Sequence, residues 1–298
     1  MPISTYNRGV IAAVVAYTYW SLIPVYWKLL VGISAQELLY SRLLLTFLTC
    51  LILLPLRGTF RTFLASWQDP TLVKQRLFAA ILISGNWFSF MWSVVNDRVM
   101  ESSLGYFLCP LVSVLLGRFI EKEHLGFSRW LAVGFAAIGV SFIVSGAHHF
   151  PYAGIVIAVT WAGYGLAKKR SSQGPLVGLG MEVGLLAPVA AALLLWTASR
   201  QPLTIAEVDG TTLGVLSLVG LVTVIPLILF AYAAQRIRLS TMGMGQYIVP
   251  SVFFVLAIFY GEPVTPLLLA GFAFIWVGLA LYAYSARQTN PVDDKGEA

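Results

Sequence analysis

Charged residues are scarce in this sequence of 298 residues. Asp, Glu, Lys and Arg together make up 11% of the chain, whereas hydrophobic residues make up 58% and the mean hydropathy is +0.82. A soluble domain usually carries about 25% charged residues. The shortage excludes an ordinary soluble protein and indicates a chain that crosses a membrane several times.

Residues that carry common enzyme chemistry are also few. The chain has three histidines and two cysteines, and both cysteines fall inside long apolar runs where a small thiol packs well. No GxxxxGK[ST] phosphate-binding loop occurs, so we expect no ATP hydrolysis in this chain. We therefore expect neither an enzyme nor a metal or cofactor site.

Long apolar runs are what the sequence has instead. A helix that rises 1.5 Å per residue needs about 20 apolar residues to cross a hydrocarbon core of about 30 Å. Ten such runs predict an all-α integral membrane protein with ten transmembrane helices. The predicted spans are residues 9–31, 36–56, 76–97, 102–120, 127–147, 151–168, 176–198, 212–234, 241–260 and 266–286.

Two similar stretches, SLGYFLCP and GMGQYIVP, fall in the fourth and ninth predicted spans. They place Gly105 opposite Gly245 and Pro110 opposite Pro250 at one constant offset. Helices interrupted by Gly or Pro line the substrate site in many secondary transporters, because freed backbone groups are tolerated beside a cavity. The alternative is that these glycines allow close helix packing and that the prolines only bend the helices.

The matching stretches predict an internal duplication. We expect a first five-helix repeat at residues 1–147, a second at residues 148–286, and a cytoplasmic tail at residues 287–298. Five spans are an odd number, so the second repeat would enter the membrane from the opposite side. Inverted repeats of this kind are typical of secondary transporters, whose substrate site lies near the membrane midplane.

Basic residues predict the orientation, because Lys and Arg near span ends stay on the cytoplasmic side. If both termini are cytoplasmic, most of the 19 basic residues lie inside. The inner residues are Arg8, Arg57, Arg61, Lys74, Arg76, Arg118, Lys122, Arg129, Lys168, Lys169, Arg170, Arg236, Arg238, Arg287 and Lys295. Topology and anionic lipid headgroups then explain the net charge of +6, and we expect no nucleic-acid partner.

A family resemblance rests on two stretches of sequence. NWFSFMWSVVNDRVMESSLGYFLCPLVSVLLG and RLSTMGMGQYIVPSVFFVLAIFYGE resemble the RarD group of the EamA family, within the drug/metabolite transporter superfamily. The likeness extends over nearly the whole chain. It implies a multi-pass permease of the bacterial inner membrane, with a central cavity between two halves and transport directed outward. It does not define the transported molecule or the oligomeric state.

Ionisable residues inside spans are costly, by about 3 kcal/mol each, and are therefore functional candidates. Glu37 belongs to SAQE, a capping box that would begin the second span, so its role is either structural or in coupling. Glu182 lies deeper, without a capping residue before it; it would carry a proton, bind a cationic group or serve as a structural hydrogen-bonding group. Arg42 would face another helix and bind either a substrate carboxylate or a helix carbonyl, unless its side chain extends to the interface.

The candidate site residues are polar or aromatic side chains within the spans. As substrate-binding residues we expect Tyr17, Arg42, Asn86, Trp87, Tyr106, Tyr164, Gln246 and Tyr247. As coupling residues we expect Glu182 and Glu37.

The functional expectation is a secondary transporter. It would move a small organic metabolite or drug across the inner membrane by alternating access, more readily outward than inward. Its partners would be the solute, membrane lipid, and protons or an exchanged solute. The alternative is a membrane-embedded signalling or accessory protein without transport activity.

Overall fold

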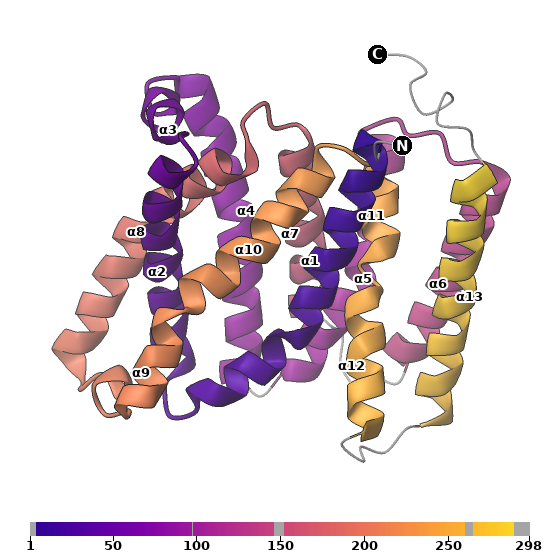
Figure 1. Ribbon diagram of the computed structural model, residues 1–298. Helices are drawn as coiled ribbons and strands as arrows, with labels where there is room; N and C mark the ends of the chain where they lie inside the picture. The colour runs from indigo at the N-terminus through magenta and orange to yellow at the C-terminus, as the bar shows by residue number, and fades with distance from the viewer. Residues whose placement is uncertain (1–3, 97, 146–151, 260–264, 289–298) are drawn as a thin grey trace.

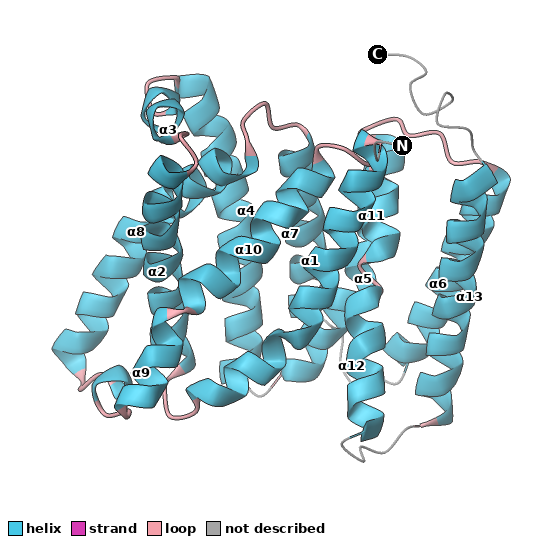
Figure 2. Ribbon diagram, in the orientation of Figure 1, coloured by secondary structure: helices cyan, strands magenta, loops and turns pink. Residues whose placement is uncertain are grey.

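The computed structural model describes residues 4–96, 98–145, 152–259 and 265–288. Within these residues the chain is helical and no strand occurs (Figure 2). The elements are α1 (Thr5–Trp27), η1 (Lys28–Leu30), α2 (Ala35–Leu56), α3 (Phe60–Ser66), α4 (Pro70–Val95), α5 (Val99–Phe119), α6 (Phe127–Ser145), α7 (Tyr152–Lys169), α8 (Pro175–Arg200), η2 (Thr204–Ala206), α9 (Gly210–Ser217), α10 (Val219–Ala234), α11 (Leu239–Gly245), α12 (Ile248–Phe259) and α13 (Pro266–Gln288).

A described helix overlaps each of the ten predicted spans. Among the described residues, eight helical segments are long and apolar enough to cross a membrane; α4 and α7 are not among them. Helices α9 and α10 share the predicted span 212–234, and α11 and α12 share 241–260. The structure therefore confirms an all-helical chain with several candidate spans, while ten transmembrane helices and an inverted repeat stay predictions.

The most extensive helix contacts join the first half of the sequence to the second. Helix α6 packs on α13, α5 on α7 and α11, α4 on α7, α2 on α8, and α1 on α10. Figure 1 shows α1 beside α10 near the centre of the bundle, with α6 and α13 together at one edge. The two halves therefore build one common bundle. The predicted boundary between residues 147 and 148 lies outside the described residues, as does the tail from residue 289.

One of the two helices that carry the matching Gly and Pro positions is not interrupted. Helix α5 is continuous through Gly105 and Pro110, so the prediction of a broken helix there is wrong. A Cβ atom at Gly105 would lie 2.6 Å from the carbonyl oxygen of Gly154. The glycine therefore lets α5 and α7 approach closely, which is the alternative that the sequence left open.

The second interruption is present. The chain leaves α11 after Gly245 and begins α12 at Ile248. Pro250 has no backbone N–H, so it cannot bond to the carbonyl of Gln246, which instead accepts the N–H of Val249 at 3.0 Å. This short break places Gln246 and Tyr247 between two helical segments.

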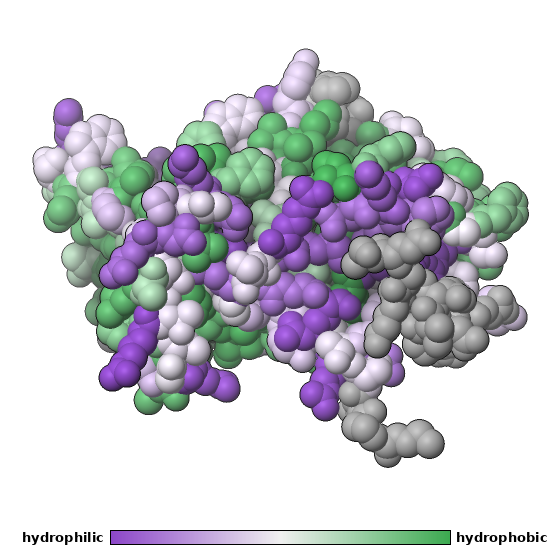
Figure 3. All heavy atoms as spheres, turned by 90° about the horizontal axis from the view of Figure 1, so that it is seen from above, coloured by the Kyte–Doolittle hydropathy of each residue, from purple (hydrophilic) through white to green (hydrophobic). Residues whose placement is uncertain are grey.

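The surface has an apolar belt and a polar end. Large hydrophobic side chains remain exposed on the helix faces, for example Ile52, Phe88 and Leu195, at 54%, 65% and 71% of their full areas. Such faces suit contact with lipid. Seen from the end where α1 begins, hydrophilic side chains gather across the middle (Figure 3). Helix α13 ends at this same end of the bundle (Figure 1).

Candidate functional site

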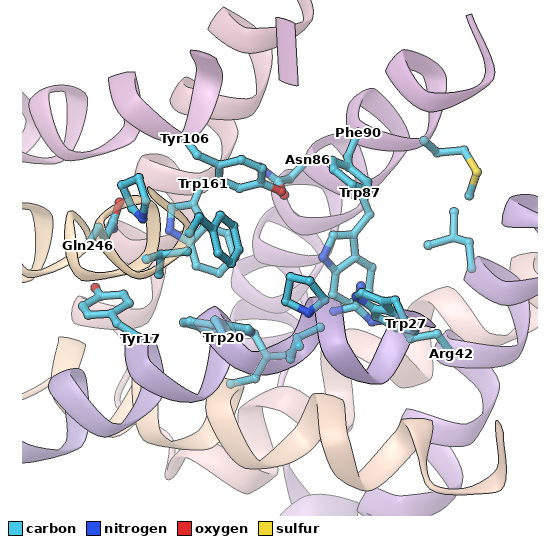
Figure 4. A pocket seen from close by; sticks show the side chains of 18 of the residues that line it. Tyr17, Trp20, Trp27, Arg42, Asn86, Trp87, Phe90, Tyr106, Trp161 and Gln246 are labelled. Carbon is cyan, nitrogen blue, oxygen red and sulfur yellow. The ribbon is translucent and has the colours of Figure 1, made fainter. Parts of the chain in front are cut away.

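A cavity of about 460 Å³ lies among α1, α2, α4, α5, α7, α10 and α12. Its volume falls within the range of about 300–1,000 Å³ that small-molecule sites occupy. Aromatic rings form much of its wall, and Arg42, Asn86 and Gln246 are its polar side chains apart from two tyrosines (Figure 4). The aromatic lining residues are Tyr17, Trp20, Trp27, Trp87, Phe90, Tyr106, Trp161 and Phe253.

The structure brings most of the predicted substrate-binding residues to this cavity. Those that line it are Tyr17, Arg42, Asn86, Trp87, Tyr106 and Gln246. Tyr164, Tyr247, Glu182 and Glu37 do not line it. The first six come from α1, α2, α4, α5 and the α11–α12 break, so residues from both halves of the sequence meet here. Their role in binding stays a prediction.

Hydrogen bonds between helices hold two of these side chains in place. The Tyr17 hydroxyl donates to the carbonyl oxygen of Met242 at 3.1 Å, which ties α1 to α11. The Asn86 amide donates to the carbonyl oxygen of Ile157 at 3.0 Å, which ties α4 to α7. Both side chains are almost fully buried. The bonds fix part of the cavity wall while they satisfy polar groups that burial would otherwise penalise.

Arg42 is the charged side chain of the cavity lining. Its Nε donates to the Thr223 hydroxyl at 3.1 Å, and its guanidinium carbon lies 4.3 Å from the ring centroid of Trp87 and 5.6 Å from that of Trp27. Cation–π contacts of this kind stabilise a desolvated guanidinium without neutralising it. In the described part of the chain, no carboxylate pairs with Arg42. The cavity therefore carries a positive charge at this end.

Glu182 lies in a buried ion cluster outside the cavity. Lys168 Nζ is 2.6 Å from each carboxylate oxygen, and Arg76 Nη1 is 3.0 Å from Oε1. The Tyr164 hydroxyl donates to Oε2 at 3.0 Å, and Arg76 Nη2 donates to the Ser171 hydroxyl at 2.5 Å. The sequence predicts an acid without a capping partner. The structure gives this acid two cationic partners from α4 and α7.

Aromatic rings in contact connect the cavity to this cluster. Trp20 and Trp161 line the cavity, and their ring centroids lie 5.7 Å and 5.0 Å from that of Phe230. Phe230 stacks on Tyr164 with a centroid separation of 6.1 Å, and Tyr164 donates to Glu182. The predicted site residue Tyr164 therefore lies one layer behind the cavity wall.

Glu37 acts where a helix begins. Ser34 caps α2, because its hydroxyl accepts the backbone N–H of Glu37 at 3.3 Å, as the SAQE pattern predicts. The Glu37 carboxylate accepts the Ser34 hydroxyl at 3.0 Å and the backbone N–H groups of Thr204 and Ile205 at 3.1 Å and 3.0 Å. A fully buried carboxylate with these partners supports the structural alternative for Glu37.

Tyr247 is fully buried in a hydrophobic cluster with Val114 and Ile275, away from the cavity. Several aromatic residues that do line the cavity are absent from the predicted set. Trp20 and Trp27 follow Tyr17 by three and ten residues, which is the spacing of one helix face. That spacing could have identified both.

No group of three His, Cys, Asp or Glu side chains within the described ranges could hold a metal ion. Cys50 and Cys109 are both buried free thiols.

Comparisons with known proteins agree with this architecture. Residues 7–145 match the EamA-like transporter family. The uncharacterized transporter YojE of Bacillus subtilis (strain 168) is 37% identical, over 94% of this chain and 94% of its own. The protein RarD of Escherichia coli (strain K12) is 35% identical, over 95% of this chain and 96% of its own. A solved crystal structure that is 18% identical aligns over 94% of this chain and 99% of its own with a TM-score of 0.71, which shows a shared fold.

Proposed function

This chain is a RarD-type permease of the EamA-like transporter family, and on that premise we propose that it exports a small organic solute across the bacterial inner membrane by alternating access. The observation that carries the proposal is the 460 Å³ cavity, whose wall combines residues from both halves of the sequence. A secondary transporter binds its solute at such an interface and exposes it to one side of the membrane at a time.

The position of the cavity supports the state of that cycle in which the solute site faces outward. Its lining includes residues 17–27 of α1, 35–42 of α2 and 86–91 of α4. These residues extend from near the middle of α1 and α4 to the later parts of these helices, and they include the early part of α2. The cavity therefore runs from the middle of the bundle toward the end opposite the N-terminus (Figure 1). With cytoplasmic termini, as the basic residues predict, it extends from the middle of the membrane into the outer half.

Polar contacts between the two halves of the sequence close the other end. Arg76 of α4 meets Glu182 of α8 in the buried ion cluster. Glu123 accepts the backbone N–H groups of Leu239 and Ser240 at 2.5 Å and 3.0 Å, and the hydroxyl of Ser240 at 2.6 Å, at the start of α11. These contacts would have to break before the cavity could open inward, which makes them a cytoplasmic gate in our proposal.

Glu182 is our candidate coupling acid because of its place in that gate. A proton on Glu182 would leave Arg76 and Lys168 without a counter-charge and would weaken the contact between α4, α7 and α8. The chain of contacting rings from Trp161 through Phe230 to Tyr164 would transmit a change in the cavity to this acid. The uphill drive would then be the proton gradient, with an exchanged solute as the alternative.

Counterflow in proteoliposomes tests the proposal whichever ion drives transport, because the unlabelled solute inside the vesicles supplies the driving force. Vesicles loaded with one unlabelled solute from a panel of aromatic acids, amino acids, amines, nucleosides and antibiotics should accumulate the same labelled solute from outside. Leu39→Trp, which fills part of the cavity, should reduce the rate at least tenfold. Leu48→Trp, the same change on the exposed face of α2, should leave it unchanged. Absence of counterflow for the whole panel would favour the signalling or accessory alternative.

A further inference from the structure

The charges around the cavity restrict the solutes that it can bind. The described lining contains one cation, Arg42, and no Asp or Glu. Desolvating an unpaired charge is expensive, so a solute that enters must either bring a complementary anion or leave the guanidinium uncompensated. A cationic solute would meet repulsion from Arg42 and would find no carboxylate among these lining residues.

The free edge of the Arg42 guanidinium fits a carboxylate. Nε donates to the Thr223 hydroxyl at 3.1 Å. The two terminal nitrogens donate no hydrogen bond to any of the described residues. Trp87 and Trp27 contact the guanidinium and leave its donors available. A planar guanidinium presents parallel donors that match the two oxygens of a carboxylate.

The rest of the wall fits a flat apolar body. Trp20, Trp161 and Phe90 lie between the Arg42 end and the end where Tyr17 approaches Gln246 (Figure 4). Aromatic walls favour ring solutes by offset or edge-to-face contacts. The volume of 460 Å³ is near the lower end for ligand sites, which suits a solute of one or two rings.

From these features we propose that the solute is an aromatic monocarboxylate, with its carboxylate on Arg42 and its rings among the tryptophans. An acid without an ammonium group fits better than an amino acid, because the described lining offers no carboxylate to a second, positive group. This inference rests on the proposed transport function, since it assigns the substrate class of the same cavity.

Three probes with the same ring system test the inference by equilibrium binding to the full-length protein in detergent. They are 1-naphthylacetate, its neutral amide 1-naphthylacetamide, and the cationic 1-naphthylmethylamine. The acid should bind at least tenfold more tightly than the amide, and the amine should bind more weakly than either. Measurements on the wild-type protein are enough to overturn the inference. They would do so if the acid and the amide bound with equal affinity, or if the amine bound more tightly.

Variants then identify the cation. In Arg42→Gln the acid and amide should bind with similar affinity, whereas Arg42→Lys should keep part of the preference. Arg200 is a matched control, because it also lies over a tryptophan ring, 5.5 Å from Trp196, but outside the cavity. Arg200→Gln should retain the full preference. A preference that persists in a folded Arg42→Gln protein, verified by gel filtration, would also overturn the inference.

Counterflow separates the failure of this inference from that of the transport function. An acid that binds through Arg42 but shows no counterflow would contradict transport and support the assigned ligand class. Counterflow of amines or neutral solutes, together with weak binding of the acid, would support transport and contradict the assigned class.

Discussion

The buried ion cluster leads to a sharp prediction about Glu182. Its carboxylate lies 2.6 Å from Lys168 Nζ and 3.0 Å from Arg76 Nη1, and all three side chains are at most 2% exposed. Glu182→Gln keeps the shape of the side chain but removes the negative charge. Two buried cations then face each other without a counter-charge.

The expected cost follows from what remains after the change. Removing one partner of a buried ion pair destabilises a protein by about 3–5 kcal/mol. In a chain of this size, each kcal/mol lowers the melting temperature by roughly 2–4 °C, so we expect a decrease of about 6 °C or more. Repulsion between Lys168 and Arg76 adds to this cost.

Lys168→Met reverses the expectation. The wild-type cluster contains two cations and one carboxylate, so this variant leaves a neutral pair of Arg76 and Glu182. Its melting temperature should equal or exceed that of the wild type, because the change removes the desolvation cost of the excess buried cation and leaves no charge without a partner. The double variant, with Arg76 alone, should melt between the two single variants. Glu121→Gln is the control at the surface: Glu121 is 17% exposed and its partner Arg170 is 58% exposed, so the effect should be within about 1 kcal/mol.

Thermal unfolding in detergent, followed by tryptophan fluorescence at constant pH, measures these differences. The order of melting temperatures carries the test: Glu182→Gln lowest, the double variant next, then wild type and Lys168→Met. A Glu182→Gln protein that melts within about 1 °C of wild type would refute the reasoning that Glu182 balances two buried cations. So would a Lys168→Met protein as unstable as Glu182→Gln.

Three further predictions concern packing, the closed end and topology. Gly105→Ala should lower the free energy of unfolding by about 1–3 kcal/mol, since its Cβ would lie 2.6 Å from the facing backbone of α7. Gly134→Ala is the control and should leave stability unchanged, because a Cβ there would meet nothing within 4 Å; thermal melting curves compare the two variants. Glu123→Gln should lower the free energy of unfolding by about 1–3 kcal/mol, because the start of α11 loses a charged hydrogen-bond acceptor. Amide hydrogen exchange should increase first at the start of α11, and unchanged exchange there would contradict this role of Glu123. With cytoplasmic termini, a cysteine at Ser172 should resist an impermeant thiol reagent in intact cells while one at Thr211 reacts; the opposite result would reverse the orientation.

Much of the candidate cavity could be predicted from residue type and helical spacing. A side chain with a polar group inside an apolar span is more costly in lipid than in a protein interior, so the sequence predicts that Arg42, Asn86 and Tyr106 face inward, and all three line the cavity. Tyr164 and Tyr247 satisfy the same rule, yet they pack behind the wall. The rule separates lipid from interior, but it does not separate the lining of a cavity from the layer behind it.

The sequence by itself determined the membrane class, the helices and local features such as the Ser34 cap, because hydropathy and capping depend on residues within a few positions of each other. Only the tertiary structure decided the partners of Glu182. Arg76 lies 106 positions away on another helix, and whether two distant helices meet depends on packing across the whole bundle. The same reason applies to α5, where the close approach of α7 at Gly154 explains a glycine that the sequence alone presented as a break.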